Sequence, residues 1–168
     1  MIQDIRDYFI RLAEGHTGAL DDIYNELSVR IFNYARTITK SKEISEDVTH
    51  DVFIRIISMA ERLATIKNPV AYIMVATRNL AYDHLRKNKY AATLDEANQA
   101  SVIPTPFNML PDALSRLPAN QRETIYLHHI CGFTQKEVAK ITCVPLVTVK
   151  WRCRQAKQKL QEYFNKEA

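Results

Sequence analysis

The sequence FTQKEVAKI at residues 133–141, followed closely by VPLVTVKWR at residues 144–152, decides the fold of the C-terminal part of the chain. Thr134 and Glu137 have the spacing of a capping box, in which each side chain bonds the backbone of the other residue, so a helix should begin there. A short connection and a second helix follow. Two helices of this length and separation have the dimensions of a helix-turn-helix.

The second of these helices has two different sides. Apolar residues three or four positions apart form one stripe, which should face the core. They are Val149, Cys153, Ala156 and Leu160. Five basic residues and no acidic residue lie between Pro145 and Leu160. A basic face alone is compatible with simple solvation, but Trp151 on that face is not, and it favours a docking surface.

Helical periodicity also dominates the rest of the chain. Only 3 of the 168 residues are glycine and 6 are proline, which favours long helices over hairpin-rich β structure. We expect a loop over residues 63–68 and no strand, and therefore an all-α fold. The expected helices span about residues 4–13, 17–38, 44–60, 69–87, 108–115, 119–130, 134–141 and 145–164.

The periodicity stops between residues 89 and 106, where Thr, Ser, Asn and Pro accumulate. This composition is typical of a flexible linker. The prediction is two small helical domains, at residues 1–88 and 107–168, of which the second contains the helix-turn-helix.

The charge of +4 is unevenly distributed. Residues 1–90 hold 13 Lys/Arg against 12 Asp/Glu, whereas residues 107–168 hold 10 against 5. An excess of positive charge in the C-terminal domain attracts a polyanion, most simply nucleic acid.

The sequence argues against a membrane protein and against catalysis. The apolar runs are too short to span a bilayer, the first residues lack a signal peptide, and three widely spaced cysteines suit reduced thiols, so we expect a cytoplasmic protein. A zinc site at His128, His129, Cys131 and Cys143 is disfavoured by the ligand spacing. No Gly-rich phosphate loop, HExxH motif or nucleophile elbow is present. We therefore expect that the protein is not an enzyme and that it binds no cofactor, metal or small-molecule substrate.

Three segments together resemble the extracytoplasmic-function (ECF) sigma factors of bacterial RNA polymerase. The helix-turn-helix, with its lead-in LPANQRETIYL at residues 117–127, is similar to the promoter-binding domain of that family. Residues 45–55, SEDVTHDVFIR, resemble its polymerase-binding helix, and residues 71–87, AYIMVATRNLAYDHLRK, resemble its −10-recognition helix. The order and the intervening linker match the minimal, two-domain type.

The resemblance implies a sigma factor that binds core RNA polymerase and recognises the −10 and −35 promoter elements. The implied contacts to the β′ clamp helices are Asp47, His50, Asp51 and Arg55. Those to the −10 element, next to a loop at residues 61–69, are Tyr72, Arg78, Asn79, Tyr82, Arg86 and Lys87. Those to the −35 element are Val147, Thr148, Lys150, Trp151, Arg152, Arg154 and Lys157. Further implied partners are the β subunit of the polymerase and an anti-sigma factor, and the linker would thread toward the RNA exit channel.

The chemistry of these residues agrees with the implied roles. Asp47 and Asp51 are one turn apart on one face, off the apolar stripe, and free to meet basic groups of a partner. The −10 set combines aromatic, amide and cationic groups, which suits bases turned out of the duplex. Asn79 and Asp83 are alternatively interpreted as polar ties between helices.

The chain departs from the family pattern at four positions. Cys143 replaces a common glycine at the helix-turn-helix turn, where a positive φ favours glycine. Val147 and Trp151 replace residues common in the recognition helix, so promoter preference does not carry over. His50 replaces a common glutamine. Two alternatives remain open: a helix-turn-helix regulator acting without polymerase, and a paralogue that binds polymerase without reading a promoter.

Overall fold

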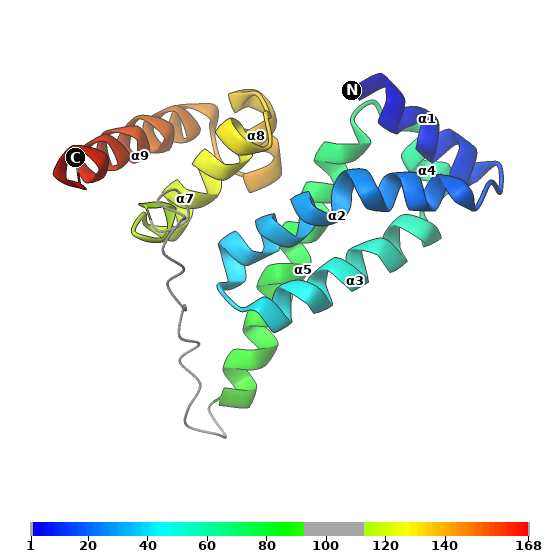
Figure 1. Cartoon of the computed structure of the whole chain (residues 1–168), viewed down its shortest axis with the longest axis horizontal. Helices are drawn as coiled ribbons and strands as arrows, with labels where there is room; N and C mark the ends of the chain where they lie inside the picture. Colours follow the sequence, from blue (N-terminus) through cyan, green and yellow to red (C-terminus); the bar gives the residue numbers. More distant parts are fainter. Residues whose placement is uncertain (1, 93–112, 168) are drawn as a thin grey trace. The chain divides into compact units, whose positions relative to one another are not determined.

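The computed structural model describes residues 2–92 and 113–167, which form two compact units (Figure 1). Every regular element assigned in these residues is helical, which confirms the all-α fold. No helix in the described ranges is both long and apolar enough to cross a membrane. The expected linker began at residue 89, but the preceding helix continues to Ala92. Residues 93–106 of that linker lie outside the described residues.

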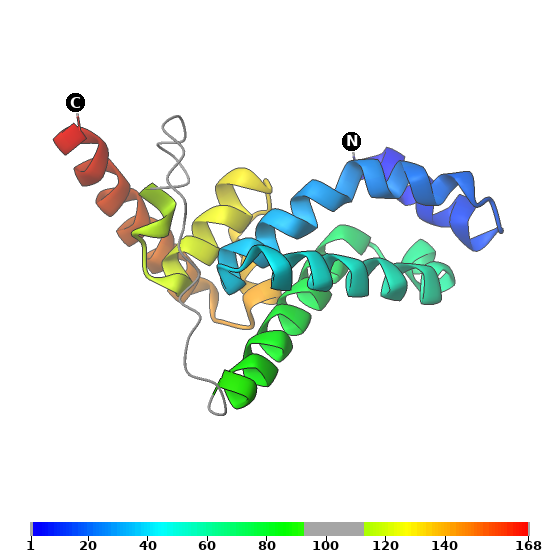
Figure 2. The same ribbon diagram turned by 60° about the horizontal axis from the view of Figure 1, so that its bottom comes forward.

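Residues 2–92, the described part of the first unit, contain five helices. They are α1 (Ile2–Ala13), α2 (Gly18–Thr39), α3 (Lys42–Ser58), α4 (Ala60–Thr65) and α5 (Pro69–Ala92). α2 packs against α1, α3 and α5, and α5 also packs against α3. In Figure 1 α5 passes behind α2 and α3, and in both ribbon views its C-terminal end projects past them (Figures 1 and 2).

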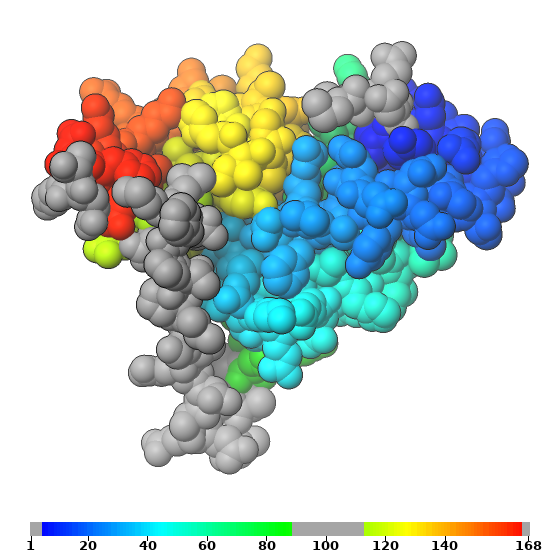
Figure 3. Space-filling view, in the orientation of Figure 1, coloured from blue at the N-terminus to red at the C-terminus, as the bar shows by residue number. Residues whose placement is uncertain are grey.

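The core of this unit is centred on α2. Its apolar residues recur three or four positions apart, and Ile23, Leu27, Ile31 and Tyr34 are completely buried. Complete burial of side chains of this size contributes roughly 1.5–3 kcal/mol each to stability. α3 adds Val48, and side chains fill the space between α2 and α3 on the face shown in Figure 3. The packing therefore fixes which faces of α3 and α5 point outward.

The residues that precede α3 and α2 differ in whether they cap the helix start. Ser41 accepts a hydrogen bond from the Ile44 backbone N–H at 3.3 Å, so α3 begins at Lys42, two residues before the expected start. Thr17 precedes α2, which begins at Gly18, and its side chain makes no capping bond.

The prediction of a loop over residues 63–68 is wrong for its first half. Residues 60–65 form α4, with sequence AERLAT, whose residues have high helix propensity apart from the final threonine. Leu63 is buried, and α4 packs against α1. Burial against a distant segment therefore adds a turn that local periodicity did not reveal.

The second unit contains α7 (Ala119–Ile125), a π-helical segment η1 (Tyr126–Ile130), α8 (Gln135–Thr142) and α9 (Leu146–Glu167). Residues 113–115 are also helical, whereas residues 108–112 of that expected helix lie outside the described part. Leu117 and Ala156 belong to its core, against which Leu160 packs.

The predicted capping box is confirmed at the start of α8. The Thr134 backbone N–H donates to the Glu137 carboxylate at 2.8 Å, and the Glu137 backbone N–H donates to the Thr134 hydroxyl at 3.3 Å. These two bonds satisfy donors that a helix start leaves unpaired. The beginning of the helix-turn-helix is thereby fixed by local chemistry.

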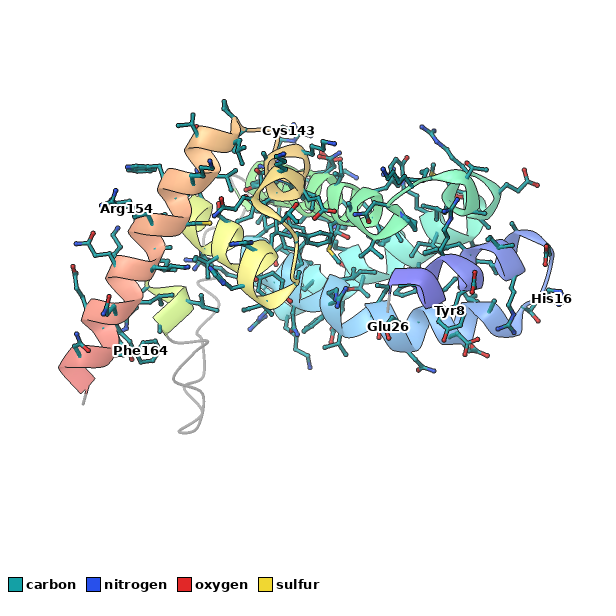
Figure 4. The ribbon with its side chains drawn as sticks, turned by 90° about the horizontal axis from the view of Figure 1, so that it is seen from above. Tyr8, His16, Glu26, Cys143, Arg154 and Phe164 are labelled. Carbon is teal, nitrogen blue, oxygen red and sulfur yellow. The ribbon has the colours of Figure 1, made fainter. Side chains whose placement is uncertain are left out.

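The turn between α8 and α9 has the left-handed backbone conformation that favours glycine, although its residue is a cysteine. Cys143, labelled in Figure 4, has φ 56° and ψ 39°, in the left-handed region. Its backbone N–H donates to Ala139 and so ends α8. The turn therefore keeps the geometry that favours glycine, at a steric cost of roughly 1 kcal/mol for a residue with a side chain.

Candidate polymerase and nucleic-acid interface

The outward face of α3 combines charge with apolar surface. Asp47, His50 and Arg55 are exposed, as the sequence predicted. Ile54 and Ile57 are each 53% exposed, and Ile54 lies seven residues after Asp47, on the same side of the helix. Neither isoleucine is among the contacts predicted from the sequence. A face of this composition fits a protein partner that offers both apolar and basic groups.

Asp51 has a partner inside the chain. His84 Nε2 lies 3.0 Å from the Asp51 carboxylate Oδ2, which joins α3 to α5. This contact occupies one carboxylate oxygen of Asp51, whose side chain is 43% exposed, so its contact with polymerase stays a prediction. The side chain of His84 is only 22% exposed, so this bond is partly shielded from water. Such a bond positions two helices that each carry a proposed contact surface.

The N-terminal part of α5 places Tyr72 beside two groups of neighbouring segments. The Arg62 guanidinium carbon of α4 lies 5.6 Å from the centre of the Tyr72 ring, within range of a cation–π interaction. The Tyr72 hydroxyl also lies 3.8 Å from the sulfur of Met59. Arg62 is exposed, so it adds a cation beside Tyr72 that the sequence analysis did not include.

The C-terminal part of α5 pairs its charged side chains along the helix. The Arg78 guanidinium carbon is 4.8 Å from the centre of the Tyr82 ring, and Arg86 forms an ion pair with Asp83. Asp83 therefore makes its ion pair within one helix, and Asn79 is exposed. These positions argue against the alternative interpretation of the two residues as ties between helices.

The residues proposed for the −10 element largely share one side of α5. Tyr72, Asn79, Tyr82 and Arg86 are spaced by seven, three and four residues, which places them on one face. Tyr72 is half-buried, Tyr82 is 37% exposed, and Asn79, Arg86 and Lys87 are exposed. The face thus presents aromatic, amide and cationic groups together.

α9 has the two sides that the sequence predicted. Val149, Cys153 and Ala156 are buried, and Leu160 is partly buried. Figure 4 shows Arg154 projecting from the side of α9 that faces away from α7 and α8. The remaining proposed −35 contacts divide into exposed and half-buried groups. Val147, Lys150, Trp151 and Lys157 are exposed, whereas Thr148 and Arg152 are half-buried.

The electrostatics next to α9 are set by burial and by neighbouring cations. Burial lowers the pKa of His129, and His128 and Lys157 lower it further, which favours the neutral ring. Burial raises the pKa of the Cys153 thiol, although Lys157 opposes that shift, so the sulfur remains protonated in the core. Within residues 2–92 and 113–167, no cluster of three or more His, Cys, Asp or Glu is arranged to hold a metal ion.

Comparison with known families identifies both units. Residues 23–90 match the family model of sigma-70 region 2, and residues 107–160 match that of sigma-70 region 4. The two matches together cover most of the chain. The match to sigma-70 region 2 argues against the alternative that the chain is a helix-turn-helix regulator acting without polymerase.

Individual relatives agree over nearly the full length. The RNA polymerase sigma factor CarQ of Myxococcus xanthus is 23% identical, over 90% of this chain and 92% of its own. The ECF RNA polymerase sigma factor SigM of Bacillus subtilis is 24% identical, over 88% of this chain and 96% of its own.

Solved structures share the fold. The sigma factor RpoE of Bartonella quintana, in complex with the anti-sigma factor NepR, matches with a TM-score of 0.72 and 22% identity, over 86% of this chain and 96% of its own. CnrH, in complex with the cytosolic domain of CnrY, matches with a TM-score of 0.65 and 18% identity, over 97% and 98% of the two chains.

The chain therefore belongs to the sigma-70 family, and within it to the ECF sigma factors. It is a promoter-recognising subunit that binds core RNA polymerase and directs the initiation of transcription. The family is not a class of enzymes.

The bond between His84 and Asp51 is testable by a double-mutant cycle. We expect Asp51→Ala and His84→Ala each to lower the stability of the α3–α5 pair by about 1 kcal/mol, and the double variant to cost less than their sum. Hydrogen exchange of α3 and α5 peptides in the full chain measures this stability. The matched control is Asp47→Ala, an exposed aspartate one turn earlier on α3, which should change it by less than about 0.5 kcal/mol. Additive losses would show that the two side chains do not interact.

Proposed function

We propose that three outward helix faces divide the work of this sigma factor. The face of α3 binds the β′ clamp helices of core polymerase, that of α5 binds the −10 element as it opens, and that of α9 enters the major groove of the −35 element. One observation carries the proposal: each helix buries an apolar stripe and leaves outward a face whose chemistry fits a different partner.

The polymerase contact is centred on Asp47, with His50, Ile54 and Arg55 around it. Asp47 is exposed and has the negative charge that a basic partner requires. Ile54 supplies apolar area, which is typical of the centre of a protein interface. Asp51 contributes by holding His84, and thereby by fixing α5 relative to α3.

The −10 contact consists of the aromatic and cationic groups of α5, extended by Arg62 on α4. Tyr72 and Tyr82 offer ring surface, Asn79 offers a hydrogen-bonding amide, and Arg86 and Lys87 offer charge. Stacking on aromatic rings with cations nearby is the usual way of holding single-stranded bases. The cation–π contact between Arg62 and Tyr72 keeps a cation next to one of these rings.

The −35 contact is the outward side of α9. No Asp or Glu occurs from Leu146 to Gln161, so nothing on this stretch of the helix repels phosphate. Lys150 and Arg154 are close enough to the start of the helix to meet base edges, while Lys157 lies further along and meets backbone. Binding of DNA and polymerase, without catalysis, then accounts for the activity and requires a cytoplasmic location.

An anti-sigma factor is part of the proposal as a regulatory partner. Of two proteins with the same fold, RpoE of Bartonella quintana is found in complex with the anti-sigma factor NepR, and CnrH with the cytosolic domain of CnrY. The half-exposed isoleucines of α3 offer such a regulator apolar surface to cover.

The polymerase contact is tested by reversing one charge. We expect Asp47→Lys to weaken binding to core polymerase by more than about 1.5 kcal/mol, because a charge-assisted contact is lost and a like charge meets the partner. Competition binding with a labelled sigma factor measures this. Glu26→Lys on α2 is the control, since Glu26 is exposed and lies two residues beyond Tyr24, whose ring contacts Phe53 of α3, and so points away from α3. Equal affinity of the Asp47→Lys and Glu26→Lys variants would remove α3 from the interface.

The −35 contact is tested by separating base and phosphate contributions. We expect Lys157→Ala to weaken holoenzyme binding to all promoter variants alike and to reduce the salt slope by about one. Arg154→Ala should cost about 1–3 kcal/mol and relax preference at one base pair, as a bidentate contact to guanine would. The measurement is binding to a promoter-variant series at two salt concentrations. A uniform loss with Arg154→Ala would make it a phosphate contact.

A further inference from the structure

Two large apolar side chains stand in solvent at the start of α9. Val147 is 71% exposed, and Trp151, one turn later on the same side, is 55% exposed. Both lie on the helix that provides the buried residues Val149 and Cys153. Neither side chain of this pair packs in the core, so folding does not explain why two large apolar residues are exposed here.

The surroundings of this pair restrict what covers it. Lys150 and Arg154, each three residues after one member of the pair, are exposed on the same side of the helix. Lys157 follows one turn later, and α9 has no carboxylate before Glu162. An apolar patch whose charged neighbours on α9 are all cations fits an anionic partner that itself presents small apolar groups.

The major groove of DNA has this combination. Phosphates line its edges, and the 5-methyl group of thymine is the apolar feature that a base pair presents there. Residues near the start of a recognition helix are the ones that reach base edges. Val147 is the second residue of α9, and Trp151 begins the next turn with a ring large enough to cover a neighbouring base.

We propose that Val147 and Trp151 are specificity-determining residues that recognise thymine 5-methyl groups in the −35 element. This rests on the proposed placement of α9 in the −35 major groove. The preferred −35 sequence then contains at least one thymine whose methyl group strengthens binding, in addition to the base read by Arg154. Burial of one methyl group corresponds to an affinity gain of about fourfold.

Thymine and uracil differ only by this methyl group, which gives a direct test. The full chain is first assembled with core polymerase and used to select −35 sequences from a randomised duplex library. Each thymine of the selected duplex is then replaced in turn by deoxyuridine, and the affinity of the holoenzyme is measured. We expect a loss of about fourfold at one or two positions with the unaltered chain, and a ratio near one at those positions with Trp151→Ala or Val147→Ala.

The control is Arg154→Ala, which should lower affinity overall and keep the thymine-to-uracil ratio. Sequence-selective binding with a ratio near one at every thymine, or selection of no thymine, would overturn the methyl proposal and leave promoter binding intact. A ratio unchanged in both Trp151→Ala and Val147→Ala would assign the methyl contact to other residues and also overturn it. Loss of core polymerase affinity with Trp151→Ala, at an unchanged ratio, would identify the pair as a protein-docking surface. Failure of the holoenzyme to select any sequence would instead contradict the proposed function of α9 itself.

Discussion

Burial of the apolar stripe of α2 is the constraint on which the first unit depends. Ile23, Leu27 and Ile31 are completely buried, and α2 packs against α1, α3 and α5. Because a helix has one buried stripe, packing on α2 determines which residues of α3 and α5 remain in solvent. The Asp51–His84 bond then fixes the two outer helices relative to each other. The outward faces of α3 and α5, which we propose to bind polymerase and the −10 element, therefore both result from the packing of one core.

In the second unit, a small set of residues fixes where the helices begin and end and which side of α9 faces outward. The capping box of Thr134 fixes the start of α8, the left-handed Cys143 ends it, and the buried stripe of α9 sets the rotation of the recognition helix. The basic and apolar residues of α9 face outward as a result. Electrostatic attraction brings such a surface to DNA, while the identity of the side chains near the helix start determines which sequence it prefers.

Most of these structural features could be predicted from the sequence because the patterns that indicate them are local. Period-3.6 stripes, the Thr134–Glu137 pair and the run of cations in α9 each act within a few residues, and the structure confirms them. The features that the sequence did not predict depend on contacts between residues far apart in the chain. Helix α4 is stabilised by burial of Leu63 and packing on α1, and Asp51 meets a histidine 33 residues away. The exposure of Ile54 and Ile57 likewise required knowledge of which side of α3 meets the core. The wide turns of η1, closed by a bond from the Cys131 N–H to the Tyr126 carbonyl, have no local signal that we recognise.

Transcription from a defined template tests the central claim, that this chain directs core polymerase to promoters. Purified core polymerase is combined with the chain on linear DNA carrying a −35 and −10 sequence selected by the holoenzyme, and run-off transcripts are measured. The account predicts a transcript of fixed start that requires both the chain and the selected promoter. Binding to core polymerase without any promoter-dependent transcript would contradict it, and would instead describe a paralogue that has kept the polymerase contact and lost promoter recognition.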